Sequence, residues 1–88
     1  MTKNLQLVQI TADDWEGIYF NGLLKTEGHR VPFRDLMEII VEEGGRIEYW
    51  ATIEADADWL NDLGNLPDTL REVKFAENEI IPAGLVWA

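Results

Sequence analysis

The sequence has no cysteine, no serine and a single histidine, His29. Without cysteine, the chain can form neither disulfide bonds nor thiolate metal sites. The common nucleophile–base pairs of enzymes need serine or cysteine beside histidine, so they cannot be assembled from these residues. The glycines stand singly or as Gly44-Gly45, and none belongs to a loop of the kind that cradles a phosphate. We therefore expect a protein that is not an enzyme and that binds no cofactor.

Long apolar runs and targeting signals are also missing. A helix that crosses a bilayer needs about 20 consecutive apolar residues, and the longest apolar run here is far shorter. Polar residues follow Met1, where a secretion signal would have its apolar core. A chain of 88 residues can build one small core but not two. We expect a single domain, residues 1–88, that is cytoplasmic and makes no contact with a membrane.

Basic residues are scarce. Seven lysines and arginines stand against 17 aspartates and glutamates, which gives a formal net charge of −10. Such a surface repels nucleic acids and attracts basic proteins. The charge is also uneven, because residues 1–41 carry a net charge of −2 and residues 42–79 a net charge of −8. This asymmetry predicts an acidic face that meets the basic surface of another protein.

The first third of the chain predicts three strands. Leu5–Ile10 is a short segment in which apolar residues alternate with glutamines. Asn21-Gly22 stands between two apolar runs and is a strong hairpin signal, because both residues tolerate the positive φ angles of a tight turn. We expect the two strands of that hairpin at residues 16–20 and 23–27.

A helix should follow Pro32, a residue that suits the first turn of a helix. Four apolar side chains then recur at helical spacing and are expected to face the core: Phe33, Leu36, Met37 and Ile40. Gly44-Gly45 should end this helix in the left-handed conformation that glycine adopts without strain.

The segment from Arg46 to Leu63 predicts a strand that leads into a second helix. Alternation is expected to place Ile47, Tyr49, Ala51 and Ile53 on one side of the strand. Asp56 is suited to cap the helix. The apolar, uncharged residues 80–88 should pack as an edge strand or lie between two copies of the chain. The predicted fold is an α+β domain with a small antiparallel sheet of four or five strands and two helices.

This strand–helix segment is also the best candidate for a partner-binding surface. It contains five acidic residues and no basic one from Glu48 to Asp62. Trp50 shares the expected side of its strand with two of them, and an aromatic residue among acids is typical of an interaction hot spot for a basic partner. The predicted partner-binding residues are Glu48, Trp50, Glu54, Asp56, Asp58 and Asp62.

A calcium site at Glu54, Asp56 and Asp58 is the competing interpretation of these acids. An EF-hand loop needs a glycine soon after the last carboxylate, and Trp59 and Leu60 stand there instead. Helix capping explains Asp56 more simply, and we expect no metal site.

The only basic cluster is formed by His29, Arg30 and Arg34 at the predicted start of the first helix, where backbone N–H groups could also receive an anion. It supports an alternative function, a small oligomeric binder of an anionic or nucleotide-like ligand. Tyr19 or Tyr49 would stack on that ligand, and the apolar C-terminal tail would form the homo-oligomer interface.

The segment D-W-E-G-I-Y-F-N-G-L-L-K-T-E-G-H, Asp14 to His29, resembles a stretch of small uncharacterised bacteriophage proteins. The resemblance implies a phage origin and, if so, the cytoplasm of the host. Small acidic phage proteins are often inhibitors that occupy the nucleic-acid groove of a host protein. By that analogy we expect an inhibitor that occludes such a basic surface by charge mimicry, with a phage structural or assembly role as a further alternative.

Overall fold

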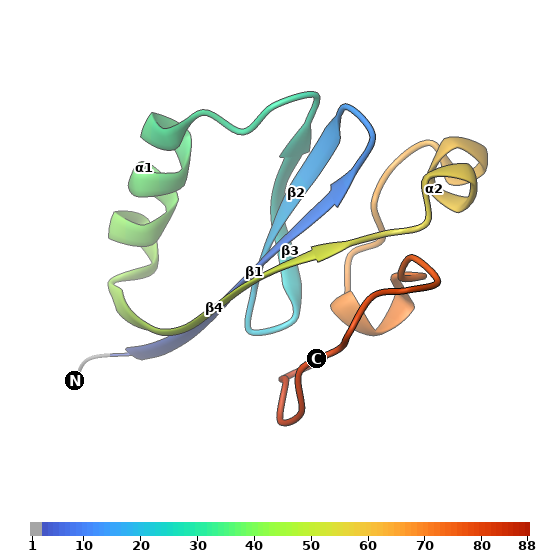
Figure 1. The fold of residues 1–88 in the computed structure, drawn as a ribbon. Helices are drawn as coiled ribbons and strands as arrows, with labels where there is room; N and C mark the ends of the chain where they lie inside the picture. Colours follow the sequence, from blue (N-terminus) through green and yellow to red (C-terminus); the bar gives the residue numbers. More distant parts are fainter. Residues whose placement is uncertain (1–2) are drawn as a thin grey trace.

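The computed structural model describes residues 3–88, which form four strands, two α-helices and one short 3-10 helix (Figure 1). In chain order these are β1 (Lys3–Ala12), β2 (Trp15–Phe20), β3 (Leu23–Gly28), α1 (Phe33–Glu43), β4 (Gly45–Glu54), α2 (Ala57–Leu63) and η1 (Leu70–Glu72). The predicted α+β class, with a small sheet and two helices, is confirmed.

The sheet has the strand order β3-β2-β1-β4. The strands β1, β2 and β3 form antiparallel hairpins, and the predicted turn at Asn21-Gly22 is confirmed by φ angles of 51° and 86°. In contrast, β4 pairs parallel to β1, so the sheet is mixed where only antiparallel pairing was expected. A parallel neighbour needs a crossover connection in place of a tight turn. The segment between β3 and β4, which contains α1, provides that crossover.

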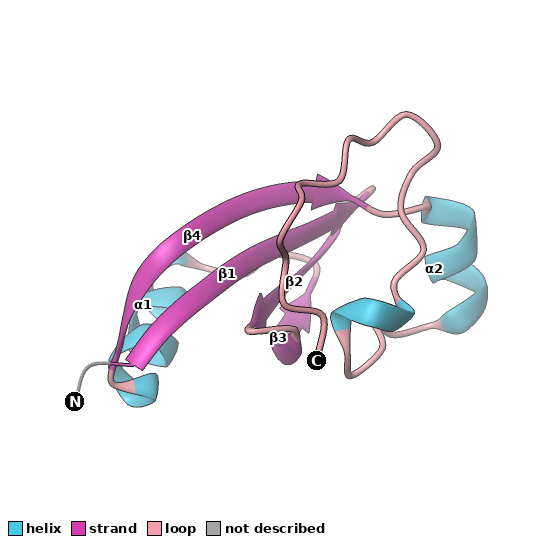
Figure 2. Ribbon diagram, turned by 90° about the horizontal axis from the view of Figure 1, so that it is seen from below, coloured by secondary structure: helices cyan, strands magenta, loops and turns pink. Residues whose placement is uncertain are grey.

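The two faces of the sheet carry separate apolar clusters. On one face, α1 covers Leu5, Leu7, Ile18 and Phe20. On the other face, α2 and the C-terminal segment cover a larger cluster, which includes Val8, Ile10, Tyr19 and Ile53. Figures 1 and 2 show this division, with α1 on one side of the strands and α2 on the other.

A bulge in β4 changes which side chains share a face. Leu5 pairs with Ile47 but Gln6 pairs with Tyr49, so Glu48 is the extra residue. Ile47 therefore packs under α1, whereas Ile53 lies in the opposite cluster. The expectation that Ile47 and Ile53 share one side is wrong, because a one-residue shift reverses the facing of a strand.

The helix α1 faces the sheet with only two of its four predicted core residues, Leu36 and Ile40. Leu36, Ile39 and Ile40 pack on the sheet, whereas Phe33 and Met37 are 72% and 42% exposed. The backbone N–H of Val31 donates to Glu16 Oε1 (2.6 Å), which fixes how the chain enters the helix. The apolar arc of α1 is thus wider than the small cluster beneath it, and part of the arc remains uncovered.

The C-terminal segment packs on the core of its own chain. Leu85 is buried, and the Trp87 ring meets Phe75 edge to face at 5.9 Å. The side-chain amide of Gln6 bonds both the N–H and the carbonyl oxygen of Val86 (2.7 and 3.0 Å). Residues 80–88 form no strand, so the expected edge strand is not found; side-chain contacts and a backbone hydrogen bond from the N–H of Arg71 to the carbonyl oxygen of Trp87 (3.3 Å) hold the segment instead.

Candidate partner-binding surface

Trp50 lies on the edge strand β4 and is 58% exposed. It stands opposite Leu7 in the parallel register, so its side chain is on the sheet face that α1 covers in part. Thr52 and Glu54 follow on the same face, opposite Gln9 and Thr11. The uncovered part of this face thus carries Trp50 beside polar side chains.

A ladder of polar side chains forms the floor next to Trp50. The Thr52 hydroxyl donates to Gln9 Oε1 (3.2 Å), and Gln9 Nε2 donates to Glu16 Oε2 (3.3 Å). A groove of about 670 Å³ lies between this ladder and the start of α1, with Trp50 and Phe33 in its walls. Because the floor is polar and its groups are paired, a partner that covers it leaves few buried groups unsatisfied.

The outer edge of β4 is open beside Trp50. The N–H of Ala55 donates to Thr11 in β1 (2.8 Å), whereas the N–H and the carbonyl of Glu54 point outward, to Glu79 Oε1 (3.1 Å) and to the N–H of Ala76 (2.9 Å). Successive residues of a strand point their backbone N–H and carbonyl groups to opposite edges. The backbone groups of Trp50 and Thr52 therefore point outward, as those of Glu54 do. Within residues 3–88 they have no hydrogen-bond partner, which leaves a short edge open to another chain.

The predicted acidic residues do not form one uniform patch. Glu48, at the bulge, lines a small hollow with Gln6, Tyr49 and Val86, away from the groove beside Trp50. Asp58 and Asp62 are exposed on α2, one helical turn apart. The structure therefore keeps Trp50 and Glu54 together on one sheet face and places Glu48 elsewhere.

Asp56 is occupied by its structural role. Its Oδ1 accepts a hydrogen bond from the N–H of Trp59 (2.9 Å), which confirms the predicted helix cap. Its Oδ2 lies 3.7 Å from Lys74 Nζ. The backbone hydrogen bond, aided by the Lys74 charge, holds the pKa of this carboxyl below its usual value. Asp56 adds negative charge to the surface but is not free to reorient toward a partner.

The parallel pairing gathers acids that the sequence did not group. The carboxyl ends of β1 and β4 meet at one end of the sheet, with Thr11 opposite Glu54. The turn after β1 supplies two exposed aspartates, and Glu79 reaches the backbone of Glu54. We call this group the acidic end: Asp13, Asp14, Glu54, Asp56, Asp58 and Glu79. A prediction that β4 lies parallel to β1 would have found Asp13 and Asp14.

The three basic residues of the alternative site do not converge. His29 Nδ1 lies 3.3 Å from Asp14 Oδ2, and the His29 ring packs edge to face on Trp15. Arg30 lines the groove beside Trp50, and Arg34 lines a different hollow on the outer side of α1. The three side chains line three different hollows instead of converging on one.

The two tyrosines proposed to stack on that ligand are also badly placed for it. Tyr19 is fully buried and donates its hydroxyl hydrogen to the carbonyl oxygen of Pro67 (2.6 Å). Tyr49 stands opposite Gln6, away from the groove that Arg30 lines. Neither ring is within reach of a ligand at the start of α1.

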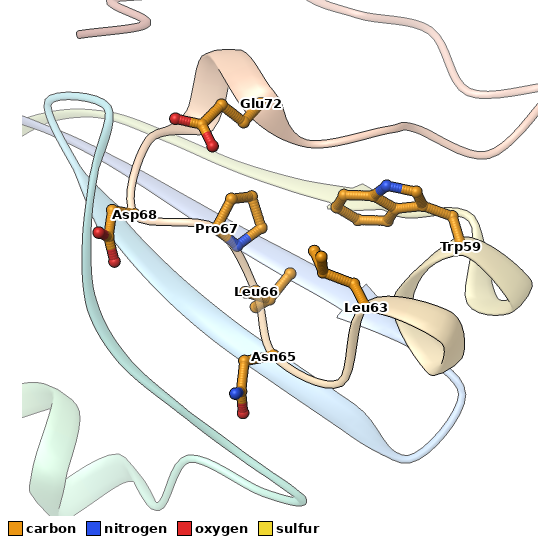
Figure 3. Close-up of a pocket in the computed structure, with 7 residues that line it drawn as sticks. All are labelled: Trp59, Leu63, Asn65, Leu66, Pro67, Asp68 and Glu72. Atoms are coloured by element: carbon orange, nitrogen blue, oxygen red, sulfur yellow. The ribbon is translucent and has the colours of Figure 1, made fainter.

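A further hollow of about 450 Å³ lies between α2 and η1 (Figure 3). Trp59 and Leu63 project into it from α2, and Asp68 and Glu72 stand on the other side. Its charged lining is acidic only, so it does not suit an anionic ligand. In the described part of the chain, no three histidine, aspartate or glutamate side chains are grouped as metal ligands would be.

Comparisons with protein-family models, with curated proteins and with solved structures found no match for this chain. None of the helices in residues 3–88 has both the length and the apolar character needed to cross a membrane. Fold and surface define the class: a small α+β domain with an acidic end and an open edge strand.

Proposed function

We propose that this protein is a non-enzymatic binding module for a basic surface of another protein. The observation that carries the proposal is Trp50, a large aromatic side chain left 58% exposed on an open strand edge. Aromatic residues of this kind dominate the binding energy of many interfaces. Glu54 lies four residues along the same strand and leads into the acidic end, which supplies charge complementarity to a basic partner.

In this proposal, the partner covers Trp50 and the open edge of β4 while its lysines and arginines meet the acidic end. The net charge of −10 steers the encounter and makes it sensitive to salt. Carboxylates would take the place of nucleic-acid phosphates, so the bound partner would be occluded from its own ligand. A phage inhibitor of a host nucleic-acid-binding protein, acting in the host cytoplasm, is the form of this function that the resemblance of Asp14–His29 favours.

Charge reversal at the acidic end tests the proposal. The tagged protein and the double variant Glu54→Lys/Asp58→Lys are used to capture partners from a lysate at low and high salt, with and without competing DNA. Because the partner's basic groups would then face lysines, capture should fall at least tenfold, about 1.4 kcal/mol or more of binding free energy. The captured protein should also be released by salt and displaced by DNA.

The double variant Asp35→Lys/Asp68→Lys is the matched control. It changes the net charge equally, both residues are exposed, and Asp35 lies in the first turn of a helix as Asp58 does. The control should retain the partner. If both variants bind as the wild type does, the proposal is rejected; if both lose the partner equally, only net charge matters and the acidic end is not the site.

A further inference from the structure

The open edge of β4 is bounded at both ends. At one end, the bulge at Glu48 interrupts the regular strand. At the other end, residues 74–76 pair with the chain where β4 ends. Between these limits, the outward backbone groups of Trp50 and Thr52 have no hydrogen-bond partner within residues 3–88. Figure 2 shows β4 at the margin of the sheet, with no strand beyond it.

Residues 74–76 show how an extended segment adds to this edge. The N–H of Asp56 donates to the carbonyl oxygen of Lys74 (2.9 Å), and the N–H of Ala76 donates to the carbonyl oxygen of Glu54 (2.9 Å). These two bonds enclose an antiparallel bridge. The edge of β4 therefore accepts an antiparallel neighbour, and the chain itself begins one.

Glu79 ends this pairing. The chain turns after Ala76, because the N–H of Glu79 donates to the carbonyl oxygen of Ala76 (3.1 Å). In a longer antiparallel pair, that oxygen would accept the N–H of Glu54. Glu79 Oε1 accepts it instead (3.1 Å). A carboxylate thus completes the last pair, and the next outward groups, those of Thr52 and Trp50, are left for another chain.

One face beside the open edge suits basic side chains. A residue on an added strand shares its face with the residue opposite, and its long side chain also reaches the diagonal neighbours. The diagonal neighbours of a residue opposite Thr52 are Trp50 and Glu54, both exposed. An arginine there can pair with the carboxylate of Glu54 and stack on the ring of Trp50.

The other face beside the edge suits apolar side chains. Tyr49 is 40% exposed, and Ala51 is half-buried against the larger apolar cluster. Apolar side chains on an added strand would cover both residues and extend that cluster. The two faces together therefore favour a segment in which basic and apolar residues alternate.

We propose that the basic partner binds as an extended segment that pairs antiparallel with β4, in the direction that residues 74–76 begin. Its basic residues stand opposite Trp50 and Thr52, and apolar residues alternate with them. This inference rests on the proposed function, because it gives the form in which a basic protein reaches the acidic end. A second copy of the chain suits the edge poorly, because each copy carries a net charge of −10.

N-methylated peptides test the added strand. A short peptide in which arginine alternates with valine, blocked at both ends, is titrated at low salt while the amide resonances of Trp50 and Thr52 are followed. In the proposed pair, the arginine N–H groups face β4 and the valine N–H groups face away. N-methylation of the arginines should therefore weaken binding at least tenfold, whereas N-methylation of the valines should change it little. The two methylated peptides have the same side chains and charge, so each is the control for the other.

A proline in β4 tests the same edge from the other side. Thr52→Pro removes an outward N–H that makes no bond to β1, and edge strands tolerate proline. It should weaken binding of the unmethylated peptide at least tenfold. Thr52→Val is the matched control, because it also loses the hydroxyl bond to Gln9 but keeps the N–H. The methylated peptides are measured on the wild type, so their contrast holds even if Thr52→Pro does not fold.

Four outcomes overturn the proposal. Equal binding of the two methylated peptides means that the peptide backbone does not pair with β4. Loss of binding on valine methylation alone rejects the antiparallel pair with arginines on the Trp50 face. Absence of binding by the unmethylated peptide at millimolar concentration rejects the alternating pattern. A wild type that sediments as a dimer, and that Thr52→Pro makes monomeric, assigns the edge to a second copy.

These outcomes are distinct from failure of the proposed function. Capture from a lysate that survives charge reversal at Glu54 and Asp58 rejects the basic partner itself. Capture that is lost on charge reversal, together with equal binding of the two methylated peptides, rejects only the added strand.

Discussion

At the residue scale, Tyr19 joins the sheet to the loop after α2. Its ring is fully buried, and its hydroxyl bonds the carbonyl oxygen of Pro67 across 48 residues of sequence. Burial, with the negative charge of Glu27 nearby, raises the pKa of Tyr19 above its ordinary value. The phenol therefore stays neutral in the folded protein at a pH where an exposed tyrosine ionises.

Removing the Tyr19 hydroxyl should destabilise the fold. Tyr19→Phe leaves the Pro67 carbonyl without its partner, so we expect the free energy of unfolding to fall by about 1–2 kcal/mol in urea denaturation. Tyr49→Phe is the control and should change it little, because Tyr49 is partly exposed and no hydrogen bond of its hydroxyl is found in the described residues. Equal effects of the two substitutions would contradict the buried hydrogen bond.

The pH dependence has a definite sign. The pKa of Tyr19 is raised in the folded state, so the stability that it contributes is complete below about pH 10, where the unfolded tyrosine begins to ionise. It is lost as the pH rises further. The alkaline loss of stability should be smaller in Tyr19→Phe than in the wild type.

Asp56 shows why a group of acids in a sequence is not yet a binding site. Its carboxylate caps α2 and lies near Lys74, so its position follows from the needs of the fold. Glu54 and Asp58 have no comparable role for their side chains in residues 3–88. They are therefore the informative residues to reverse in a binding experiment.

At the scale of the elements, local signals in the sequence predicted the turns and caps well. The hairpin at Asn21-Gly22 and the left-handed end of α1 at Gly44 (φ 64°) were both predicted, because they depend on one or two residues. The side of α1 that faces the sheet was predicted only in part, since Leu36 and Ile40 pack on it but Phe33 and Met37 do not. The apolar arc of α1 is too wide for its sequence to choose one orientation, and contacts with residues distant in sequence, such as the bond from the N–H of Val31 to Glu16, have no local signal.

The turn glycine of the β2–β3 hairpin also holds the C-terminal segment. A Cβ atom on Gly22 would lie 2.5 Å from the carbonyl carbon of Trp87, and the residue has a φ of 86°. Gly22→Ala should therefore cost more than the roughly 1–2 kcal/mol of a left-handed alanine, because the segment must also move. We expect exposure of Trp87, seen as a change in tryptophan fluorescence and faster proteolysis of the C-terminus.

Gly84→Ala separates these two effects. Gly84 has a similar φ of 81°, but a Cβ atom added there would have no neighbour within 4 Å. The substitution should lower the free energy of unfolding only by the cost of a left-handed alanine, and it should leave the surroundings of Trp87 unchanged. If Gly22→Ala and Gly84→Ala are equally destabilised, the close approach of Trp87 to the turn contributes nothing.

At the scale of the whole molecule, strand direction decides which charges lie together. Composition predicted an acidic face, and the sequence grouped Glu54 with Asp58 because they are close along the chain. It could not place Asp13 and Asp14 beside them, because that depends on the parallel pairing of β1 with β4. The bulge at Glu48, which moves that carboxylate away from Trp50, likewise has no local sequence signal.

The carboxyl end of β4 lies at the acidic end of the molecule, and the open strand edge runs back from there toward Trp50. One basic partner could therefore cover both.

Amide hydrogen exchange of Trp50 and Thr52, measured with and without the captured partner, tests the central claim most directly. In the free protein both amides should exchange fast, because they point outward from β4, while the inward amides of Ala51 and Ile53 are protected by β1. Saturating partner should slow exchange at Trp50 and Thr52. If both amides exchange equally fast in the complex and in the free protein, the partner does not bind at this edge, and the account is contradicted.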